Sequence, residues 1–480
     1  MTSPSAQTVL AIDQGTSGTK AVVVDAVDGV LASAEIALRP VYGGGGSVEV
    51  SPQDLLDSVL AAGRQAVGAA GRPVHAVALA NQGETVLAWD PATGQPLSPA
   101  IVWQDRRAEA LVGELAAARD WVAQRTGLVL DPYFSAPKMA WLRRTITTAG
   151  VVTTSDTWLI HRLCGAFVTD ASTASRSLLT DLDGVGWDRE LLALFGLQDE
   201  ALPRIVACDE VVGSTSGFGT ELPVGGLIVD QQAALLAQRC LEAGAAKCTF
   251  GTGAFLLANT GDQPHRSTSG LTASVAWRLR GTTSYCLDGQ VYAAASVVRW
   301  LQELGLVAGP GDIDRTAAPD AAGVLCVPAL AGLAAPWWRS DATATFTGMT
   351  LDSGAPHLVL AAMQGIAAQV AELADSIHAD LGSPLSRLRV DRGLARCRTL
   401  MQATADIAQI PVDVYPLDHA TALGAAATGL LAVQPGLDVA SAIPAWPAGD
   451  SYEPSWSADR AADFRRRWRS TAEAMLQVGR

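Results

Sequence analysis

Apolar and polar segments alternate at the start of the chain in a pattern typical of a β-hairpin. Thr8–Ile12 is an almost wholly apolar run, and Lys20–Asp25 is a second one. Between them lies a short turn rich in glycine, threonine and serine, Asp13–Thr19. Two apolar strands joined by such a turn predict a buried hairpin.

The pattern then changes to the period of a helix. Ser51 is a suitable N-cap, Pro52 fits the first helical position, and Asp54 can complete a capping box. Apolar residues follow at helical spacing at Leu55, Leu56, Val59, Leu60 and Val67. Beyond this helix we expect a strand at Val74–Ala80 and the arm of a second hairpin at Thr85–Asp90.

The opening pattern returns half a chain later. Ala246–Leu257 again reads as strand, glycine–threonine turn and strand, which indicates a duplicated domain. A length of 480 residues also exceeds what one hydrophobic core usually holds. We therefore predict two related α/β domains, residues 1–241 and residues 242–480.

The second half also alternates strand and helix. A long helix is predicted at His357–His378, a short strand at Leu388–Val390, and helices at Thr399–Ile407 and Ala422–Leu431. The last of these is rich in alanine, which suits close packing. Aromatic and arginine residues between positions 456 and 469 predict an amphipathic closing helix that caps the second domain or forms a subunit contact.

Composition narrows the class of protein. Hydrophobic residues make up 49% of the chain and charged residues 17%, which indicates a globular protein with buried sheets. The net charge of −14 disfavours nucleic acid and membrane surfaces as partners, because both repel an acidic protein. Seven scattered cysteines without a C-x-x-C pair, and an N-terminus (Met1–Gln7) without an apolar signal segment, predict a reduced, cytoplasmic protein.

The first turn carries groups that suit a phosphate. Its small residues let backbone N–H groups approach an anion, Thr16 and Ser17 add hydroxyl donors, and Lys20 adds a positive charge. Asp13, at the end of the first strand, could orient Mg²⁺ through water. Taken alone, the segment is better interpreted as an ordinary hairpin turn, because turns rich in glycine and threonine are common. The turn at Thr249–Gly253 offers the same chemistry, and two such turns could hold a triphosphate from opposite sides of a cleft.

A carboxylate follows a buried strand near the middle of the chain. Asp230 comes directly after the uncharged run Leu227–Val229, where α/β proteins present catalytic groups. A positioned aspartate can accept a hydroxyl proton, and it can also cap the helix that follows. Asn81–Glu84, Trp103 and Tyr133 could contact a hydroxylated ligand, or serve only as a turn and as packing.

Taken together, these segments resemble the FGGY family of carbohydrate kinases over about residues 9–433. Ile12–Lys20 resembles the family's opening motif, Tyr133–Leu142 its first signature and Ala344–Gln364 its second. Further similar segments are Asp156–Ile160, Thr169–Asp170, Ala174–Arg176, Val327–Trp338 and Thr421–Ala426. Within the family, the likeness is greatest to the kinases that act on glycerol.

The resemblance implies two duplicated actin-like (ribonuclease-H-like) domains that flank a catalytic cleft and close over ATP, Mg²⁺ and a small polyol or sugar. It implies a polyol-binding N-terminal domain, an ATP-binding C-terminal domain and Asp230 as the catalytic base. The residues implied to hold the polyol are Glu84, Trp103, Tyr133, Asp230, Gln231 and Phe255. Those implied to hold phosphate and nucleotide are Thr16, Ser17, Lys20, Gly251, Thr252 and Gly393, with Asp13 at the metal. A homo-oligomer is an open possibility.

Two positions depart from the family pattern. Gly83 stands where the glycerol-specific members have arginine, which removes donors to substrate hydroxyls and opens space. A longer polyol or a ketose (erythritol, xylitol, ribulose or xylulose) is therefore the alternative to glycerol. Arg392 stands in a segment where the family has paired glycines near the adenosine, and we expect it to crowd or shift that loop. The rival from another class is a non-catalytic, nucleotide-switched protein of the actin-like fold.

Overall fold

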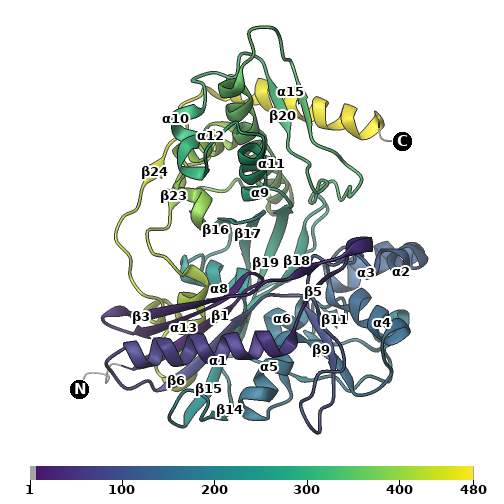
Figure 1. Ribbon diagram of the computed structural model, residues 1–480, viewed down its shortest axis with the longest axis vertical. Helices are drawn as coiled ribbons and strands as arrows, with labels where there is room; N and C mark the ends of the chain where they lie inside the picture. Colours follow the sequence, from purple (N-terminus) through teal and green to yellow (C-terminus); the bar gives the residue numbers. More distant parts are fainter. Residues whose placement is uncertain (1–6, 479–480) are drawn as a thin grey trace.

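The computed structural model describes residues 7–478, which form two α/β bodies stacked one above the other in Figure 1. The lower body, drawn mainly in purple and blue, holds most of the first half of the chain. The upper body, drawn mainly in green, holds most of the second half. The segment Met1–Gln7, predicted to lack a signal sequence, lies outside the described residues except for Gln7.

A six-stranded sheet organises the lower body. Its strand order is β14 (Val211–Thr215), β15 (Leu222–Val229), β6 (Ala76–Asn81), β1 (Thr8–Gln14), β2 (Gly18–Asp25) and β3 (Gly29–Ala37). Strands β1 and β2 pair antiparallel, which confirms the predicted opening hairpin. Strands β1, β6 and β15 run parallel, so their carboxyl ends meet at one edge of the sheet.

A seven-stranded sheet organises the upper body and repeats this topology. Its order is β18 (Thr272–Leu279), β19 (Thr282–Val291), β17 (Ala254–Gly261), β16 (Ala246–Phe250), β22 (Leu388–Asp391), β23 (Val412–Val414) and β24 (Ser451–Tyr452). As in the first sheet, an antiparallel hairpin leads to three parallel strands and then to one antiparallel edge strand. The predicted duplication is therefore confirmed, with β18 as an added strand.

The expected hairpin arm at Thr85–Asp90 is confirmed as β7 (Val86–Trp89). The chain turns back directly after it, since the Gly94 N–H donates to the Asp90 carbonyl at 2.7 Å and Trp89 pairs antiparallel with Pro96. Strand β7 does not pair with β6. It belongs to a separate five-stranded sheet with β4 (Val41–Tyr42), β5 (Val48–Val50), β8 (Ala100–Ile101) and β9 (Val151–Thr154). The chain leaves the first sheet at Glu84, whose φ of 59° lies in the left-handed region and redirects the backbone.

The helices surround these sheets. In chain order they are α1 (Pro52–Ala69), α2 (Glu109–Glu114), α3 (Arg119–Thr126), α4 (Ser135–Thr145), α5 (Ser155–Cys164), α6 (Ala171–Ser175), α7 (Arg189–Phe195), α8 (Asp230–Ala237), α9 (Ala295–Glu303), α10 (Ile313–Thr316), α11 (Ala355–Leu381), α12 (Arg398–Ala408), α13 (Ala420–Val433), α14 (Val439–Ala442) and α15 (Ala458–Val478). Short strand pairs complete the fold: β10 (Val168–Asp170) with β13 (Arg204–Val206), β11 (Thr180–Asp181) with β12 (Gly186–Trp187), and β20 (Leu325–Val327) with β21 (Thr345–Thr347).

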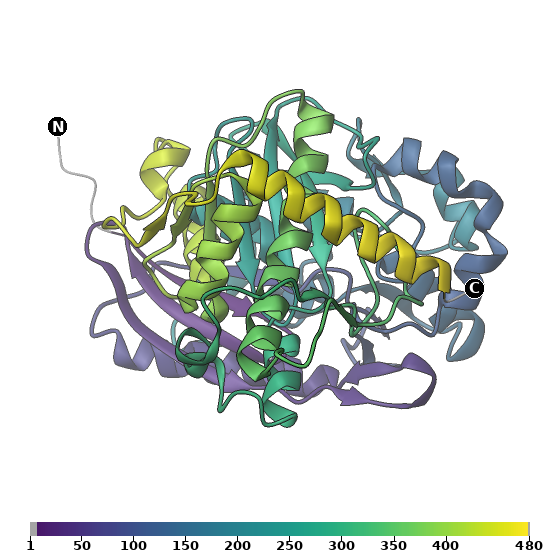
Figure 2. The ribbon, with the colours of Figure 1, turned by 90° about the horizontal axis from the view of Figure 1, so that it is seen from above.

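The predicted helices are confirmed to within a few residues. The Ser51 hydroxyl accepts the Asp54 N–H at 3.3 Å and caps α1 as expected. Helix α11 is long and apolar enough to span a membrane, but 89% of that stretch is buried inside the fold, so it is a core helix. Helix α15 lies across the upper body (Figure 2), where the buried Trp468 indole donates to the Cys326 carbonyl at 2.8 Å. It therefore caps the second body.

Close packing of small residues joins the two bodies. Helix α13 comes late in the chain, yet it packs on the first sheet and on α8. A Cβ added at Gly424 would lie 1.9 Å from the Ala233 carbonyl oxygen, and one at Gly226 would lie 2.4 Å from the Gly429 nitrogen. These glycines let the backbones approach. The predicted boundary at residues 241/242 falls between α8 and β16, beside this junction.

Candidate active site

One cavity of about 400 Å³, at the junction of the two bodies, is lined by nearly all of the candidate site residues. These are Asp13, Thr16, Ser17, Lys20, Glu84, Trp103, Tyr133, Asp230, Gln231, Gly251, Thr252 and Phe255. Gly393 lines a second cavity of about 620 Å³. Asp13, Lys20 and Arg392 line both cavities, so the two adjoin. The structure thus brings together residues spread over most of the sequence.

Asp230 begins helix α8 at the carboxyl end of β15. The N-cap residue of that helix is Val229, so the Asp230 carboxylate is left to line the cavity. Burial, and then the negative charges of Asp13 and Glu84, raise its pKa to about 7. A carboxylate whose pKa lies near neutral pH is well matched to accepting a hydroxyl proton. Asp230 is therefore not the N-cap of α8, and its carboxylate is available at the cavity wall.

The two glycine turns have defined shapes. The first is closed by the Gly15 N–H, which donates to the Gly18 carbonyl at 3.0 Å. In the second, a Cβ at Gly253 would lie 2.4 Å from the Val291 carbonyl oxygen, so glycine is required there. The Thr252 carbonyl accepts the Ala294 N–H at 2.8 Å, which ties this turn to the start of α9. Both turns line the cavity wall, and these backbone contacts define their shapes.

The Thr16 hydroxyl, at the wall of the cavity, makes two hydrogen bonds within the protein. It donates to Gln82 Oε1 at 2.9 Å and accepts the Trp103 indole N–H at 2.9 Å. These bonds join the first glycine turn to the aromatic wall. The phosphate contact expected of this hydroxyl stays a prediction, and making it would require the bond to Gln82 to be exchanged.

Three aromatic rings form one wall of the cavity. Trp103 meets Tyr133 edge-on with ring centroids 5.6 Å apart, and it meets Phe255 in the same way at 6.0 Å. The sequence predicted these three residues, and they gather although Phe255 comes from the upper body. The buried Lys138 ammonium fixes the segment of Tyr133 by donating to the carbonyls of residues 132–134. Burial lowers the pKa of Lys138 to about 7.

Glu84 belongs to a buried ion network that sequence reasoning missed. The Arg176 guanidinium donates to the Glu84 carboxylate and also to Asp288 Oδ2, the latter at 3.0 Å. All three side chains are nearly inaccessible to solvent. Arg176 also lies over the Tyr133 ring, with its central carbon 5.8 Å from the ring centroid. Arg176 therefore positions Glu84 and Tyr133, two of the candidate residues, and links the lower body to β19 of the upper one.

Gln231 is held by a buried lysine that was also missed. Lys247 Nζ donates to Gln231 Oε1 at 2.6 Å and to Thr249 Oγ1 at 2.8 Å. Thr249 in turn donates to Asp391 at 2.6 Å. Burial lowers the pKa of Lys247 below its ordinary value. The available signal was a single charge in the otherwise apolar strand β16.

The surroundings of Asp13 fit a divalent cation. Among the described residues its Oδ1 atom is buried without a hydrogen-bond partner, and a buried carboxylate oxygen needs a proton, donor or cation. Burial raises the pKa of Asp13 despite the nearby charges of Arg392 and Lys20. Within residues 7–478 no three His, Cys, Asp or Glu side chains are grouped so that they could hold a metal ion together. A cation at Asp13 would thus be shared with water and substrate phosphates, as is usual for Mg²⁺.

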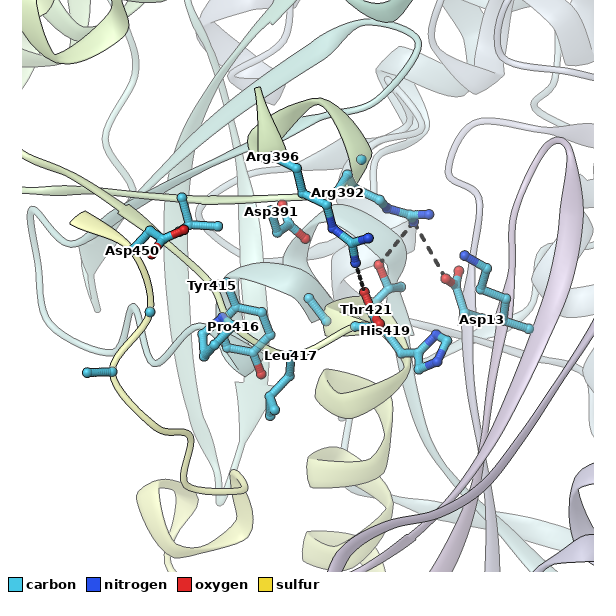
Figure 3. A pocket seen from close by; sticks show the side chains of 17 residues that line it. Asp13, Asp391, Arg392, Arg396, Tyr415, Pro416, Leu417, His419, Thr421 and Asp450 are labelled. Carbon is cyan, nitrogen blue, oxygen red and sulfur yellow. Dashed lines mark hydrogen bonds and ion pairs between the residues drawn. The ribbon is translucent and has the colours of Figure 1, made fainter. Parts of the chain in front are cut away.

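The larger cavity has room for a nucleoside. Its walls include residues 391–393, 414–421 and 448–450, all in the second half of the chain (Figure 3). Tyr415 and His419 belong to the segment between β23 and α13, and Gly393 begins a short 3₁₀ turn after β22. The cavity opens towards the carboxyl ends of parallel strands, where α/β proteins bind nucleotides.

Known proteins resemble this chain along most of its length. The model of the N-terminal domain of the FGGY family of carbohydrate kinases matches residues 8–237, and the model of the C-terminal domain matches residues 246–433. A glycerol kinase of Alkalilimnicola ehrlichii is 44% identical over 450 residues, which cover 89% of this chain and 90% of that protein. A glycerol kinase of Aromatoleum aromaticum is 39% identical over 485 residues, which cover 97% and 98%.

Solved structures give the same result. The crystal structure of Plasmodium falciparum glycerol kinase with ADP matches with a TM-score of 0.90 and 30% identity, over 98% of both chains. The gluconate kinase of Lactobacillus acidophilus matches with a TM-score of 0.89 at 20% identity, a likeness of fold alone. The expected fold of two actin-like domains is therefore confirmed. The chain belongs to the FGGY family of carbohydrate kinases.

Proposed function

We propose that this phosphotransferase moves the γ-phosphoryl group of ATP to a terminal hydroxyl of glycerol. The observation that carries the proposal is Asp230, whose pKa is raised to about 7 and which lines one cavity with an aromatic, polar wall and two glycine turns. Relatives up to 44% identical are named glycerol kinases, which supports glycerol as the acceptor.

We infer that residues 1–241 hold the polyol and residues 242–480 hold ATP. Glu84, Trp103 and Tyr133 come from the first part of the chain, and Phe255 adds a ring from the second. The larger cavity, which suits the adenosine, is lined mainly by the second part. A nucleotide placed there would extend its phosphates past residues 13 and 392 towards Asp230.

Asp230 is the proposed base of the reaction. It accepts the proton of the glycerol hydroxyl as that oxygen attacks the γ-phosphorus in line. Ser17, Lys20 and the backbone of Thr252 line the cavity on the side of the two turns, where donors can stabilise the charge of the transferred group. Mg²⁺ bound through Asp13 would neutralise part of the negative charge of the phosphate oxygens. Closing of the two domains would exclude water and limit ATP hydrolysis.

Gly83 bears on the choice between glycerol and a larger acceptor. A Cβ added at Gly83 would lie 3.0 Å from Val229 Cγ2, so a side chain there needs Val229 to move. The absence of an arginine therefore leaves no large void at the Cβ position of residue 83. The preference for glycerol over erythritol, xylitol, ribulose and xylulose rests on the relatives named glycerol kinases.

A coupled ADP-release assay with each of these five acceptors tests the function. We expect the highest kcat/KM with glycerol, and 31P NMR should show a phosphomonoester on a primary hydroxyl. A matched control is the Asp199→Asn variant, whose exposed carboxylate lies outside both cavities and which should behave as wild type. A higher kcat/KM with ribulose or xylulose would show that a ketose, and not glycerol, is the substrate. ADP release that none of the acceptors stimulates would refute the proposed kinase activity.

The raised pKa of Asp230 predicts a specific pH dependence. Only the ionised carboxylate can accept a proton, so kcat/KM for glycerol should fall roughly tenfold per pH unit below about 7 and level off above it. The profile is measured with saturating MgATP between pH 5 and pH 9. An activity that stays constant down to pH 5 would contradict the assignment of the base to Asp230.

We also propose that the enzyme works in the cytoplasm. In the described part of the chain the seven cysteines are all free thiols, and six of them are buried. Free thiols in this number are typical of proteins kept in a reducing compartment.

A further inference from the structure

Arg392 adopts a backbone conformation that arginine rarely takes. Its φ is 74° and its ψ is 178°, a region occupied almost only by glycine. The residue directly precedes the 3₁₀ turn of Gly393, in the segment between β22 and α12. Strain of this kind persists where the surrounding structure imposes it, and it points to a use for the side chain.

The guanidinium of Arg392 lies where the two cavities adjoin. Its Nη2 atom is 3.6 Å from Asp13 Oδ2 and 3.5 Å from the Thr421 hydroxyl, as the dashed lines in Figure 3 show. Arg392 lines both cavities together with Asp13 and Lys20. Any molecule that occupies both cavities at once must pass this group.

The charge of Arg392 is maintained by several carboxylates. Burial opposes the charge, but Asp13, Asp391, Asp230 and Glu35 together hold its pKa above the ordinary value of arginine. The contact with Asp13, at 3.6 Å, is longer than a charge-assisted hydrogen bond. A phosphate oxygen could therefore replace Asp13 as the partner at little cost.

We propose that Arg392 is a ligand of the nucleotide phosphates, which exchanges Asp13 for a phosphate oxygen when ATP binds. The planar guanidinium suits two oxygens of a phosphate chain, and its departure leaves Asp13 free for a cation. The inference rests on the proposed function, since it assigns a residue to the nucleotide site of that reaction. It also reverses the expectation that Arg392 merely crowds the loop.

Isothermal titration of ATP, without glycerol, tests the proposal. In EDTA, Arg392→Gly should weaken ATP binding by at least roughly tenfold, because a charge-assisted contact is lost. Excess Mg²⁺ should reduce this loss, since the cation neutralises the same oxygens. Arg392→Lys keeps the positive charge but lacks the planar guanidinium that can bond two oxygens, so it should bind ATP with intermediate affinity. Adenosine has no phosphate, so its affinity should be unchanged in Arg392→Gly.

The matched control is Arg398→Ala, which removes an exposed arginine that pairs with Asp314 outside both cavities. It should bind ATP as wild type does. Arg392→Gly relieves the backbone but also removes the cation beside Asp13, so thermal melting is used to show that the variant is folded at the temperature of the titration. Equal or tighter ATP binding by Arg392→Gly, or an equal loss of adenosine binding, would overturn the proposal. If Arg392→Gly binds ATP more weakly than wild type, as expected, but the wild type releases no ADP with glycerol, the proposed function fails and this inference stands.

Discussion

Replacing Asp230 with asparagine is expected to lower kcat with glycerol by at least ~100-fold, because the amide cannot accept the hydroxyl proton. The measurement is steady-state ADP release at pH 8 with saturating glycerol and MgATP. The KM for glycerol should change much less, since the asparagine keeps the shape of the side chain. Near-normal turnover in this variant would contradict the mechanism.

The same variant should be at least as stable as the wild type. Because the pKa of Asp230 is raised on folding, ionising the carboxylate destabilises the folded state, and this penalty grows as the pH rises towards about 7. The asparagine variant avoids it, so its gain should reach roughly 0.5–2 kcal/mol at pH 8 and be smaller at pH 5. Thermal melting at the two pH values separates loss of chemistry from loss of fold. The Asp199→Asn variant serves as the control for both measurements.

Replacing Arg176 with methionine is expected to have the largest effect on stability. It leaves the carboxylates of Glu84 and Asp288 buried without their shared cation. Removing one partner of a buried ion network typically costs about 3–5 kcal/mol. Glycerol binding should weaken as well, because Glu84 and Tyr133 lose the group that positions them. The measurements are the midpoint of chemical denaturation and the Kd for glycerol.

A triple variant distinguishes the loss of charge balance from the loss of packing. In Glu84→Gln, Arg176→Met, Asp288→Asn no charge remains at the three positions, so most of the lost stability should return while glycerol binding stays weak. If Arg176→Met alone denatures at the wild-type midpoint, the network is not important for the fold. If the triple variant binds glycerol as tightly as wild type does, Glu84 is not a polyol ligand.

Local patterns allowed much of this fold to be predicted. The hairpin turn at residues 13–19, the cap at Ser51 and the strand that ends at Asp230 each depend on neighbours in the sequence. The repeat at Ala246–Leu257 pointed to the duplicated sheet because the same short pattern occurs twice. Local patterns did not reveal that β6 and β7 lie in different sheets, a change of direction that the chain makes at Glu84 in the left-handed region.

Contacts over long sequence distances could not be predicted in this way. Arg176 bonds Glu84 across 92 positions and Asp288 across 112, and no periodicity in the chain connects them. The side-chain direction of Thr16 depends on Gln82 and Trp103, which only the folded junction brings near. The residues that line the cavity were therefore more predictable than the network that holds them in place.

A crystal structure with glycerol and a non-hydrolysable ATP analogue would test the central claim most directly. The account predicts that an Asp230 carboxylate oxygen lies roughly 2.6–3.2 Å from the glycerol hydroxyl that faces the γ-phosphorus. Glu84 should contact another hydroxyl of the same molecule. A glycerol whose terminal hydroxyl lies beyond hydrogen-bond reach of Asp230, with a different group in contact with it, would contradict the account.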